Sequence, residues 1–405
     1  MSTQIPTAAA SADAVIALLN GITRPLATER VPLDAAAGRV LREPISAPED
    51  QPPFDRSAVD GFVVRLDDAS SEFQIVDEIR AGDWKPRQLQ RGETVHISTG
   101  GALPGEQLQV VMKEDVQVSG EKILLPQRSP SGNIRFRGED ARAGQVLVEP
   151  GVKLQPGTLA LLASVGQANP LVTRVPRVLH LATGNEIVPP EQPPARGQIR
   201  DSNSILIRSF LKSWQAELEQ MRLPEDEAMA KEKLETRNLK LETADLLLIS
   251  GGASVGEHDF TRSLLTHLGF EILVSKTSLR PGKLLIVARR GNQIAFGLPG
   301  NPLAHFVCLN LFVRVALERF SGASTKPLFQ YGTLAAKLAT CRNGRETFWP
   351  AQLDLQTGTS QLTPLRWSSS GDLTSLAAAN ALIRVPPDCA DLDAGTPIEF
   401  IPTFF

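Results

Sequence analysis

The chain has 405 residues and a formal net charge of -3. Its length predicts two to four domains, and its nearly balanced charge excludes the strongly basic surface of a nucleic-acid-binding or membrane-surface protein. The long apolar helical run Leu303–Leu317 is interrupted by His305, Asn310 and Arg314, which excludes a membrane span.

The N-terminal segment MSTQIPTAAASADAVIALL has no basic part ahead of its apolar part. We therefore expect a short helix over Ala10–Asn20, not a signal peptide. The three cysteines, Cys308, Cys341 and Cys389, are far apart and odd in number, which argues against a disulfide framework and favours the cytoplasm. We find no zinc-site spacing, nucleophile elbow or Walker A loop.

Short β-like runs follow a second short helical piece. FVVRL, FQIVDEI, TVHIS, VVMKEDV and KILLP lie between Pro52 and Val148 and are separated by glycine, proline and polar turns, a pattern typical of a β-rich domain. We predict that this domain spans residues 46–146. It would be inserted into a small linking domain made of residues 1–45 and 147–175.

Apolar runs alternate with helical patterns between Val178 and Gly322. The runs VLHLAT, DLLLIS, FEILVS, KLLIVA and QIAFGL predict buried strands, and helices are expected over Ser204–Leu218, Glu225–Leu239, Phe260–Leu268 and Leu303–Phe320. This alternation predicts a central doubly wound α/β domain over residues 176–326. Short strands and turns then predict a C-terminal β domain over residues 327–405.

The last predicted strand of the α/β domain runs into the turn PGNP and then a helix. Asn301 suits the N-cap, where its side-chain oxygen would accept from first-turn N–H groups, and Pro302 suits the first helical position. Gly300 permits close approach to the backbone. This segment is either a capped helix after a tight turn or an anion site at a helix N-terminus.

Ligands of doubly wound sheets bind beyond the carboxyl ends of the strands, where GNEI, GGASVGEHDF, KTSLRPGK and PGNP are all expected. In the second loop, Gly251, Gly252 and Gly256 leave the backbone free to wrap an anion. Ser254 adds a hydroxyl, and Asp259 either caps the following helix or binds a divalent cation.

The loop KTSLRPGK contains the cations Lys276, Arg280 and Lys283. Such a run is either a solvated surface or, beside a glycine-rich loop, an oxyanion site.

Several segments occur together, in one order along the chain: PPFDRSAVDGF, ISTGGALP with VVMKED, NIRFRGED, LATGNEIV, IRDSN, ISGGASVGEHDF, LRPGK and GLPGNP. In this the sequence resembles the molybdopterin molybdenumtransferase family, which includes MoeA and the gephyrin E domain. The resemblance implies a central α/β domain of the molybdopterin-binding type. It also implies insertion of molybdenum from molybdate into adenylated molybdopterin, with Mg²⁺ assistance and release of AMP.

The resemblance further implies a homodimer in which the β-rich domain reaches toward the α/β site of the other subunit. Other proteins of molybdenum cofactor biosynthesis, or acceptor enzymes, would be partners. Asp60 matches the family's essential aspartate, Asp226 a catalytic position, and Glu186 and Asp259 acidic residues suited to holding metal and water. The implied substrate-binding positions are Thr99, Arg135, Asp140, Asp201, Ser202, Asn203, Gly251, Gly252, Ser254, Gly256, Lys276, Arg280, Lys283, Pro299, Gly300, Asn301, Arg345 and Ser370. Arg345 and Ser370 match a molybdate contact, and Arg280 stands where lysine is frequent.

The chain also departs from the family pattern. Arg56 replaces asparagine, Asn185 aspartate, Leu284 proline and Ala304 serine. Ordinary drift in a working enzyme is one interpretation, and a weakened paralogue or scaffold that binds the cofactor without efficient insertion is another. An enzyme of the preceding adenylyl transfer is a third, although it would need neither the β-rich nor the C-terminal domain. The sequence does not decide between molybdate and tungstate.

Overall fold

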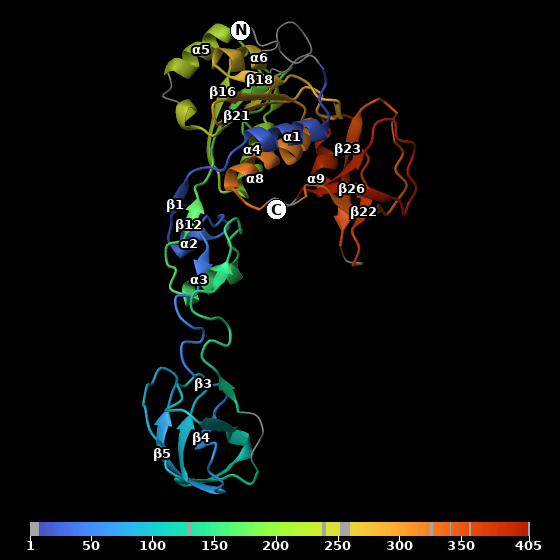
Figure 1. The fold of residues 1–405 in the computed structure, drawn as a ribbon. Coiled ribbons are helices and arrows are strands. Elements are labelled where there is room, and N and C mark those ends of the chain that lie inside the picture. The colour runs from blue at the N-terminus through green and yellow to red at the C-terminus, as the bar shows by residue number, and fades with distance from the viewer. Residues whose placement is uncertain are drawn as a thin grey trace.

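The structure is a computed structural model. It describes residues 8–127, 132–236, 240–251, 260–324, 327–340, 342–355 and 358–403. Figure 1 shows a β-rich part at one end, a small linking part, and an α/β part with a β part beside it at the other end. This arrangement confirms the predicted fold class, and the residue boundaries of the domains stay a prediction.

The β-rich part contains a sheet of order β7-β4-β6-β5-β9-β8. Successive residues of its inner strand β4 (Gly61–Arg65) alternate between two buried clusters, because side chains along a strand point to opposite faces. Val63 lies in one cluster, and Phe62 and Val64 lie in the other. The other elements are β5 (Glu72–Ile79), β6 (Glu93–Ile97), β7 (Leu108–Met112), the 3₁₀ turn η1 (Lys113–Asp115), β8 (Gln117–Ser119) and β9 (Lys122–Leu124).

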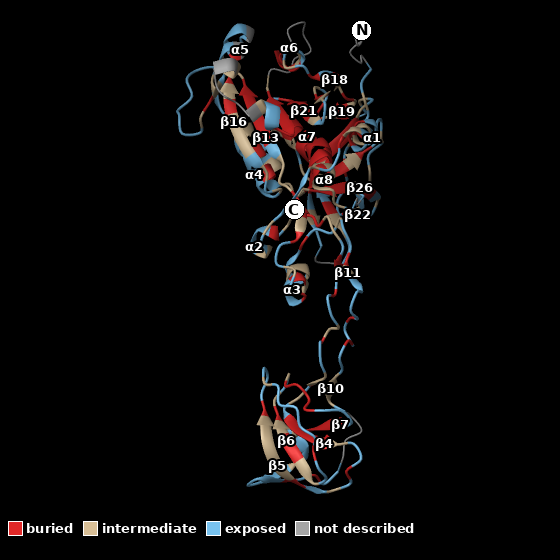
Figure 2. Cartoon of the chain, turned by 60° about the vertical axis from the view of Figure 1, so that its left-hand side comes forward, coloured by how far each residue is buried: buried red, intermediate tan, exposed pale blue. Residues whose placement is uncertain are grey.

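Short antiparallel pairs connect the β-rich part to the rest of the chain. β3 (Arg56–Ser57) pairs with β10 (Ile134–Arg135), β2 (Ile45–Ser46) with β11 (Val146–Val148), and β1 (Thr28–Arg30) with β12 (Leu171–Thr173). The linking part adds α2 (Leu33–Ala36) and α3 (Pro156–Ser164). Figure 2 shows that two extended chain segments join the β-rich part to the linking part.

The α/β part contains a sheet of order β16-β13-β17-β21-β20-β18. Neighbours among β16, β13, β17 and β21 are parallel, whereas β20 is antiparallel to both β21 and β18. The strands are β13 (Arg177–Thr183), β16 (Glu217–Leu223), β17 (Leu246–Ser250), β18 (Glu271–Val274), β20 (Ile286–Arg290) and β21 (Gln293–Leu298), with a separate pair β14 (Ile187–Val188) and β15 (Ile199–Arg200).

One predicted helix was too long. The pattern suggested a helix through Leu218, but α4 (Asn203–Lys212) ends earlier and residues from Glu217 onward form the edge strand β16. Gln215 has a φ of 54°, a left-handed conformation that stops a helix. Residues Glu217–Leu223 then pair in parallel with β13, and this pairing holds them in a strand.

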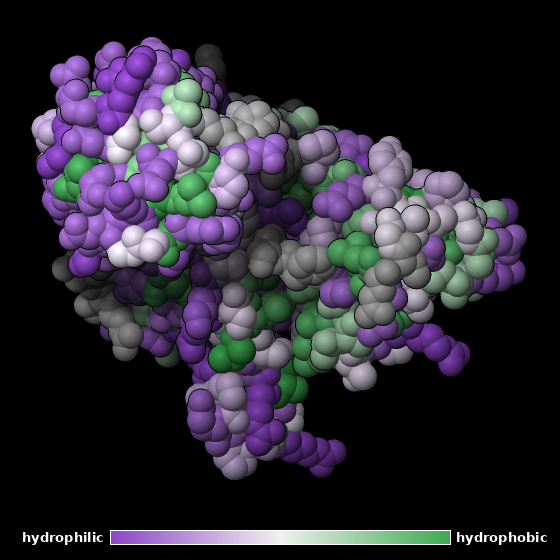
Figure 3. Space-filling view, turned by 90° about the horizontal axis from the view of Figure 1, so that it is seen from below, coloured by the Kyte–Doolittle hydropathy of each residue, from purple (hydrophilic) through white to green (hydrophobic). Residues whose placement is uncertain are grey.

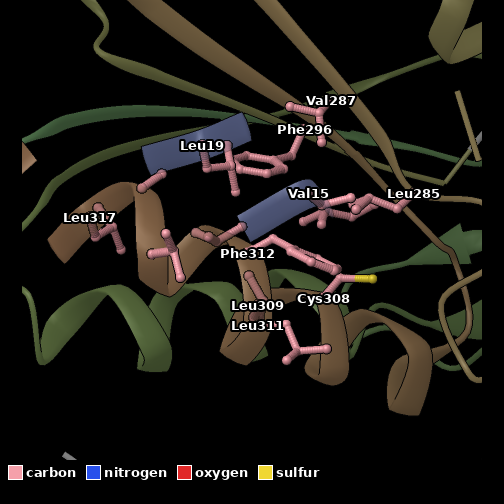
Figure 4. Close-up of a cluster of buried hydrophobic side chains, with 14 of the residues drawn as sticks. Val15, Leu19, Leu285, Val287, Phe296, Cys308, Leu309, Leu311, Phe312 and Leu317 are labelled. Atoms are coloured by element: carbon pink, nitrogen blue, oxygen red, sulfur yellow. The ribbon is translucent and has the colours of Figure 1, made fainter. Parts of the chain in front are cut away.

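Helices cover both faces of the α/β sheet. Leu246 and Leu248 face a cluster with α1 (Ala12–Ile22), whereas Leu247 and Ile249 face a cluster with α6 (Phe260–His267), so the sheet is doubly wound. Figure 4 shows the first cluster, with side chains of α1 packed between the strands and the helical stretch that holds Cys308, Leu309, Phe312 and Leu317. The remaining helices are α5 (Glu227–Thr236), η2 (Lys240–Thr243), α7 (Pro302–Cys308), the π turn η3 (Leu309–Val313) and α8 (Arg314–Ser321).

The C-terminal part contains a sheet of order β19-β23-β24-β22-β26-β25. Its first strand, β19 (Leu279–Arg280), comes from the cationic loop of the α/β part and pairs in parallel with β23 (Glu346–Asp354). The C-terminal sheet therefore holds that loop directly. The other elements are β22 (Gln330–Leu334), β24 (Gln361–Pro364), α9 (Leu373–Ala378), β25 (Ala381–Val385) and β26 (Pro397–Pro402).

The surface seen in Figure 3 is mainly hydrophilic, with hydrophobic side chains in small separate groups. Among the described residues no helix is both long and apolar enough to cross a membrane.

Candidate functional site

Three loops meet at the carboxyl ends of the adjacent parallel strands β13, β17 and β21. The hydroxyl of Thr183 donates to the carbonyl of Ser250 (3.1 Å). Gly251 has a φ of 88°, and a Cβ there would lie 2.4 Å from the carbonyl oxygen of Thr183, so only glycine fits. A Cβ on Gly300 would lie 3.8 Å from the Cα of Gly251, which places the PGNP turn beside the start of the glycine-rich loop.

The PGNP turn is tied to two other segments. Asn203 donates from Nδ2 to the carbonyl of Gly300 (2.7 Å). Asn301 stands at the N-cap of α7 and Pro302 at its first position, as the sequence predicts, but the Asn301 side chain makes no capping hydrogen bond. Its Nδ2 instead donates to Oγ of Ser370 (2.7 Å), so the predicted capping bond was wrong. Contact with the C-terminal part takes that side chain away from the helix.

The cationic loop lies against the C-terminal part. Register pairs Arg280 with Thr347 of β23, and Arg345 immediately precedes that strand. Among the residues that the structure describes, the side chains of Lys276, Arg280, Lys283 and Arg345 make no ion pair with a carboxylate. Cations gathered without counter-charges favour an anionic ligand.

The acidic residues of the α/β part have different surroundings. Asp201 is buried and accepts from the backbone N–H (3.0 Å) and hydroxyl (2.6 Å) of Ser204. Asp226 accepts from the backbone N–H of Met229 (2.9 Å). Both therefore hold first turns of helices, α4 and α5. Glu186 is exposed, and its Oε2 lies 2.7 Å from where a Cβ on Gly184 would be.

For five predicted site residues the structure gives no side-chain contact that bears on a ligand. Ser202 is the N-cap residue of α4 without a side-chain capping bond. Gly252, Ser254, Gly256 and Asp259 lie outside the described residues.

Four predicted positions form a separate group in the β-rich part. The backbone N–H of Thr99 (2.7 Å), and then its hydroxyl (3.0 Å), donate to Oδ1 of Asp60 and lower the pKa of that carboxyl below its ordinary value. Arg135 donates from Nη2 to Asp140 (2.7 Å) and also pairs with Glu139. Figure 1 places this part at the far end from the α/β loops, so one chain does not bring the two groups together.

The four residues that depart from the family pattern lie in different surroundings. Arg56 lies opposite Arg135 in the β3–β10 register. Oδ1 of Asn185 accepts from the backbone N–H of Glu225 (3.3 Å). Leu284 is half-buried and Ala304 is buried.

A chain of hydrogen-bonded polar side chains beneath the loops, of which His180 and Ser250 are buried, is absent from the sequence prediction. Arg208 donates to Oε1 of Gln220 (2.7 Å), which leaves the Gln220 amide to donate to Nδ1 of His180 (3.0 Å). His180 must then carry its proton on Nε2 and donate to Oγ of Ser250 (2.8 Å). Burial lowers the pKa of His180 to about 3, so the ring is neutral near pH 7. The only sequence signal is a histidine in the apolar run VLHLAT.

A second buried histidine supports the PGNP turn. Nδ1 of His305 contacts the carbonyl of Pro299 (3.1 Å), and because a carbonyl only accepts, Nδ1 donates. Burial lowers the pKa of His305 to about 4.

Comparison with known proteins finds matches over most of the chain. Three family models match it: the MoeA N-terminal region (domain I and II) over residues 8–166, a probable molybdopterin binding domain over residues 180–319, and the MoeA C-terminal region (domain IV) over residues 333–403. With the loops described above, these matches define a multidomain protein of molybdenum cofactor biosynthesis.

Individual relatives identify the family. A molybdopterin molybdenumtransferase from Bacillus subtilis is 33% identical over 92% of this chain and 89% of its own length, and one from Staphylococcus epidermidis is 29% identical over 92% and 90%. A crystal structure of a molybdopterin biosynthesis MoeA protein from Pyrococcus horikoshii matches with a TM-score of 0.81 and 29% identity, covering 98% of this chain and 100% of that one. The chain belongs to the molybdopterin molybdenumtransferase family, a family of transferases.

The contact between Asp60 and Thr99 leads to a testable prediction about the titration of the Asp60 carboxyl. In Thr99→Val, the pKa of Asp60 should rise, because one of its two donors is lost. It should remain below the ordinary value, because the backbone N–H is retained and is the larger cause. Carboxyl ¹³C shifts followed against pH would measure this. Ser98→Ala is the control, and an unchanged Asp60 titration in Thr99→Val would contradict the assignment.

Proposed function

We propose that the protein inserts molybdenum from molybdate into adenylated molybdopterin with release of AMP. The observation that carries this proposal is the group of cations Lys276, Arg280, Lys283 and Arg345, which lies where the α/β and C-terminal parts meet and has no ion-pair partner among the described residues. Molybdate is a tetrahedral dianion, and guanidinium, ammonium and hydroxyl donors suit its oxygens. Ser370, fixed by Asn301, would add one such hydroxyl.

Water attacks the phosphoanhydride of the adenylate, so that a new P–O bond forms as the anhydride bond breaks and AMP leaves. The two dithiolene sulfurs bind molybdenum in place of oxygen, and the displaced oxygen takes up the thiol protons and leaves as water. The chain's cations would bind and orient the anions and stabilise the charge that develops. Asp60, with its lowered pKa, is ionised near pH 7. It can therefore accept a proton or orient water, but it cannot act as a general acid.

Mg²⁺ is part of the proposal. Glu186 is exposed and makes no side-chain ion pair among the described residues, so its carboxylate fits a hard cation, which usually binds one or two carboxylates and substrate phosphates. Glu186 and Asp259 would hold the ion, which when bound would neutralise charge on the phosphates.

We further propose a cytoplasmic homodimer. The Asp60 group lies far from the cationic loop of its own chain (Figure 1), so a complete site would need the β-rich part of a second copy. A cytoplasmic location fits the odd number of widely separated cysteines.

The direct test is AMP release from adenylated molybdopterin with molybdate and Mg²⁺. Turnover supports the proposal. Binding of the pterin without turnover would instead support a weakened paralogue or scaffold, and formation of the adenylate from ATP would support the adenylyl-transfer enzyme.

Variants of the cationic loop should respond to molybdate concentration. Loss of one charge-assisted hydrogen bond costs ~1.5–3 kcal/mol, or roughly 10- to 100-fold in affinity. Lys276→Ala and Arg280→Ala should therefore be slow at limiting molybdate and recover substantially at high molybdate. Asp60→Ala should stay inactive at every molybdate concentration, because saturating the molybdate site does not restore a missing catalytic group. If neither loop variant responds to molybdate, the loop does not bind it.

Subunit mixing tests the shared site. Asp60→Ala and Glu186→Gln should each be inactive alone. After an equal mixture re-associates, about half of the dimers would contain one subunit of each variant, and each of these would have one intact site of its two. The mixture should therefore regain about one quarter of wild-type turnover. Two preparations of Asp60→Ala mixed together are the control. No recovery in the mixed sample, with exchange verified by mass, would place both residues in one subunit's site.

A further inference from the structure

Trp367 lies in the segment that runs from β24 to α9, three residues before Ser370. It belongs to none of the segments that carry the family resemblance. Its surroundings nevertheless connect it to the cationic loop.

The ring of Trp367 is fixed beside Arg280. The guanidinium carbon of Arg280 is 5.1 Å from the ring centroid, within the range of a cation–π contact. Trp349 packs edge-on against the same ring, with centroids 5.7 Å apart and planes at 86°. The indole N–H of Trp349 donates to the carbonyl of Leu365 (2.7 Å), which fixes the start of the segment.

The other end of the segment is fixed against the PGNP turn. Ser370 accepts from the side chain of Asn301 (2.7 Å), and its carbonyl accepts from the backbone N–H of Leu303 (2.9 Å). Trp367 is therefore held between the cationic loop and the PGNP turn.

One polar atom of Trp367 has no partner. Its Nε1 is buried and lacks a hydrogen-bond acceptor among the residues that the structure describes. Buried N–H groups in folded proteins are nearly always paired, and an indole N–H can donate but cannot accept. An anion bound beside Arg280 would supply the missing acceptor.

We propose that Trp367 belongs to the molybdate site, where its ring orients the guanidinium of Arg280 and its Nε1–H donates to an oxygen of the bound anion. This inference rests on the proposed function. A site made of cations, a hydroxyl and an indole N–H is rich in donors, so it favours fully deprotonated tetrahedral dianions, molybdate and tungstate alike.

Calorimetric titration of the full-length protein with molybdate tests the two roles separately. Trp367→Phe keeps the ring face and loses the N–H, and it should bind roughly tenfold more weakly, as expected for one charge-assisted hydrogen bond. Trp367→Leu loses both the aromatic ring face and the N–H, and it should bind molybdate more weakly than Trp367→Phe does. Trp84→Phe, an exposed tryptophan in the β-rich part, is the matched control and should bind like wild type.

A double-substitution cycle tests the positioning role. In an Arg280→Ala background, Trp367→Leu should cost no more than Trp367→Phe does in that background, because there is no guanidinium left to orient. Equal additional losses from Trp367→Leu in both backgrounds would reject the positioning role.

A measurement on the wild-type protein does not depend on the folding of a Trp367 variant. The chain has four tryptophans, and the Trp367 indole ¹⁵N–¹H resonance, assigned by substituting the other three, should move strongly on saturation with molybdate. An unmoved resonance, or wild-type affinity in Trp367→Phe while Lys276→Ala binds weakly, would overturn this inference and leave the proposed function intact. Failure of wild type to bind molybdate would overturn both.

Discussion

The parallel pairing of β19 with β23 is the constraint on which the candidate site depends. Because Leu279 and Arg280 are at once part of the loop after β18 and an edge strand of the C-terminal sheet, the cationic loop cannot move independently of the C-terminal part. The same pairing places Arg345 near that loop, and the ring of Trp367 contacts Arg280. Gathering like charges is unfavourable unless an anion offsets them, so a fold that holds them in place is suited to binding one.

The second constraint is the separation of two groups of polar residues. The Asp60 carboxylate is held ionised by Thr99 in the β-rich part, while the cations lie at the other end of the chain (Figure 1). Hydrogen bonds from Thr99 hold the Asp60 carboxylate, and sheet pairing holds the cationic loop. Two chain segments connect the β-rich part to the rest (Figure 2), and in the proposed dimer they would span the distance from one copy's β-rich part to the other copy's α/β part.

Sequence patterns predicted the layers better than the contacts between them. The short apolar runs correctly predicted the strands of the doubly wound sheet. Leu246–Ser250, for example, is buried on both faces, and a short continuous apolar run is typical of such a strand. Local signals failed where a distant segment decided the outcome. Asn301 bonds to Ser370 instead of capping α7, and Glu217–Leu223 pairs with β13 instead of extending α4. His180 had only the signal of a histidine in an apolar run, and Trp367 had no local signal, since the contacts of both side chains are with residues far away in sequence.

The central claim is that an oxyanion binds where the cationic loop meets the C-terminal part. The most direct measurement is a crystal structure of the protein with tungstate or molybdate, with the metal located by anomalous scattering. The account predicts a peak within hydrogen-bonding reach of Arg280, Arg345 and Ser370. A peak elsewhere in the chain, with these side chains left in contact with solvent alone, would contradict it.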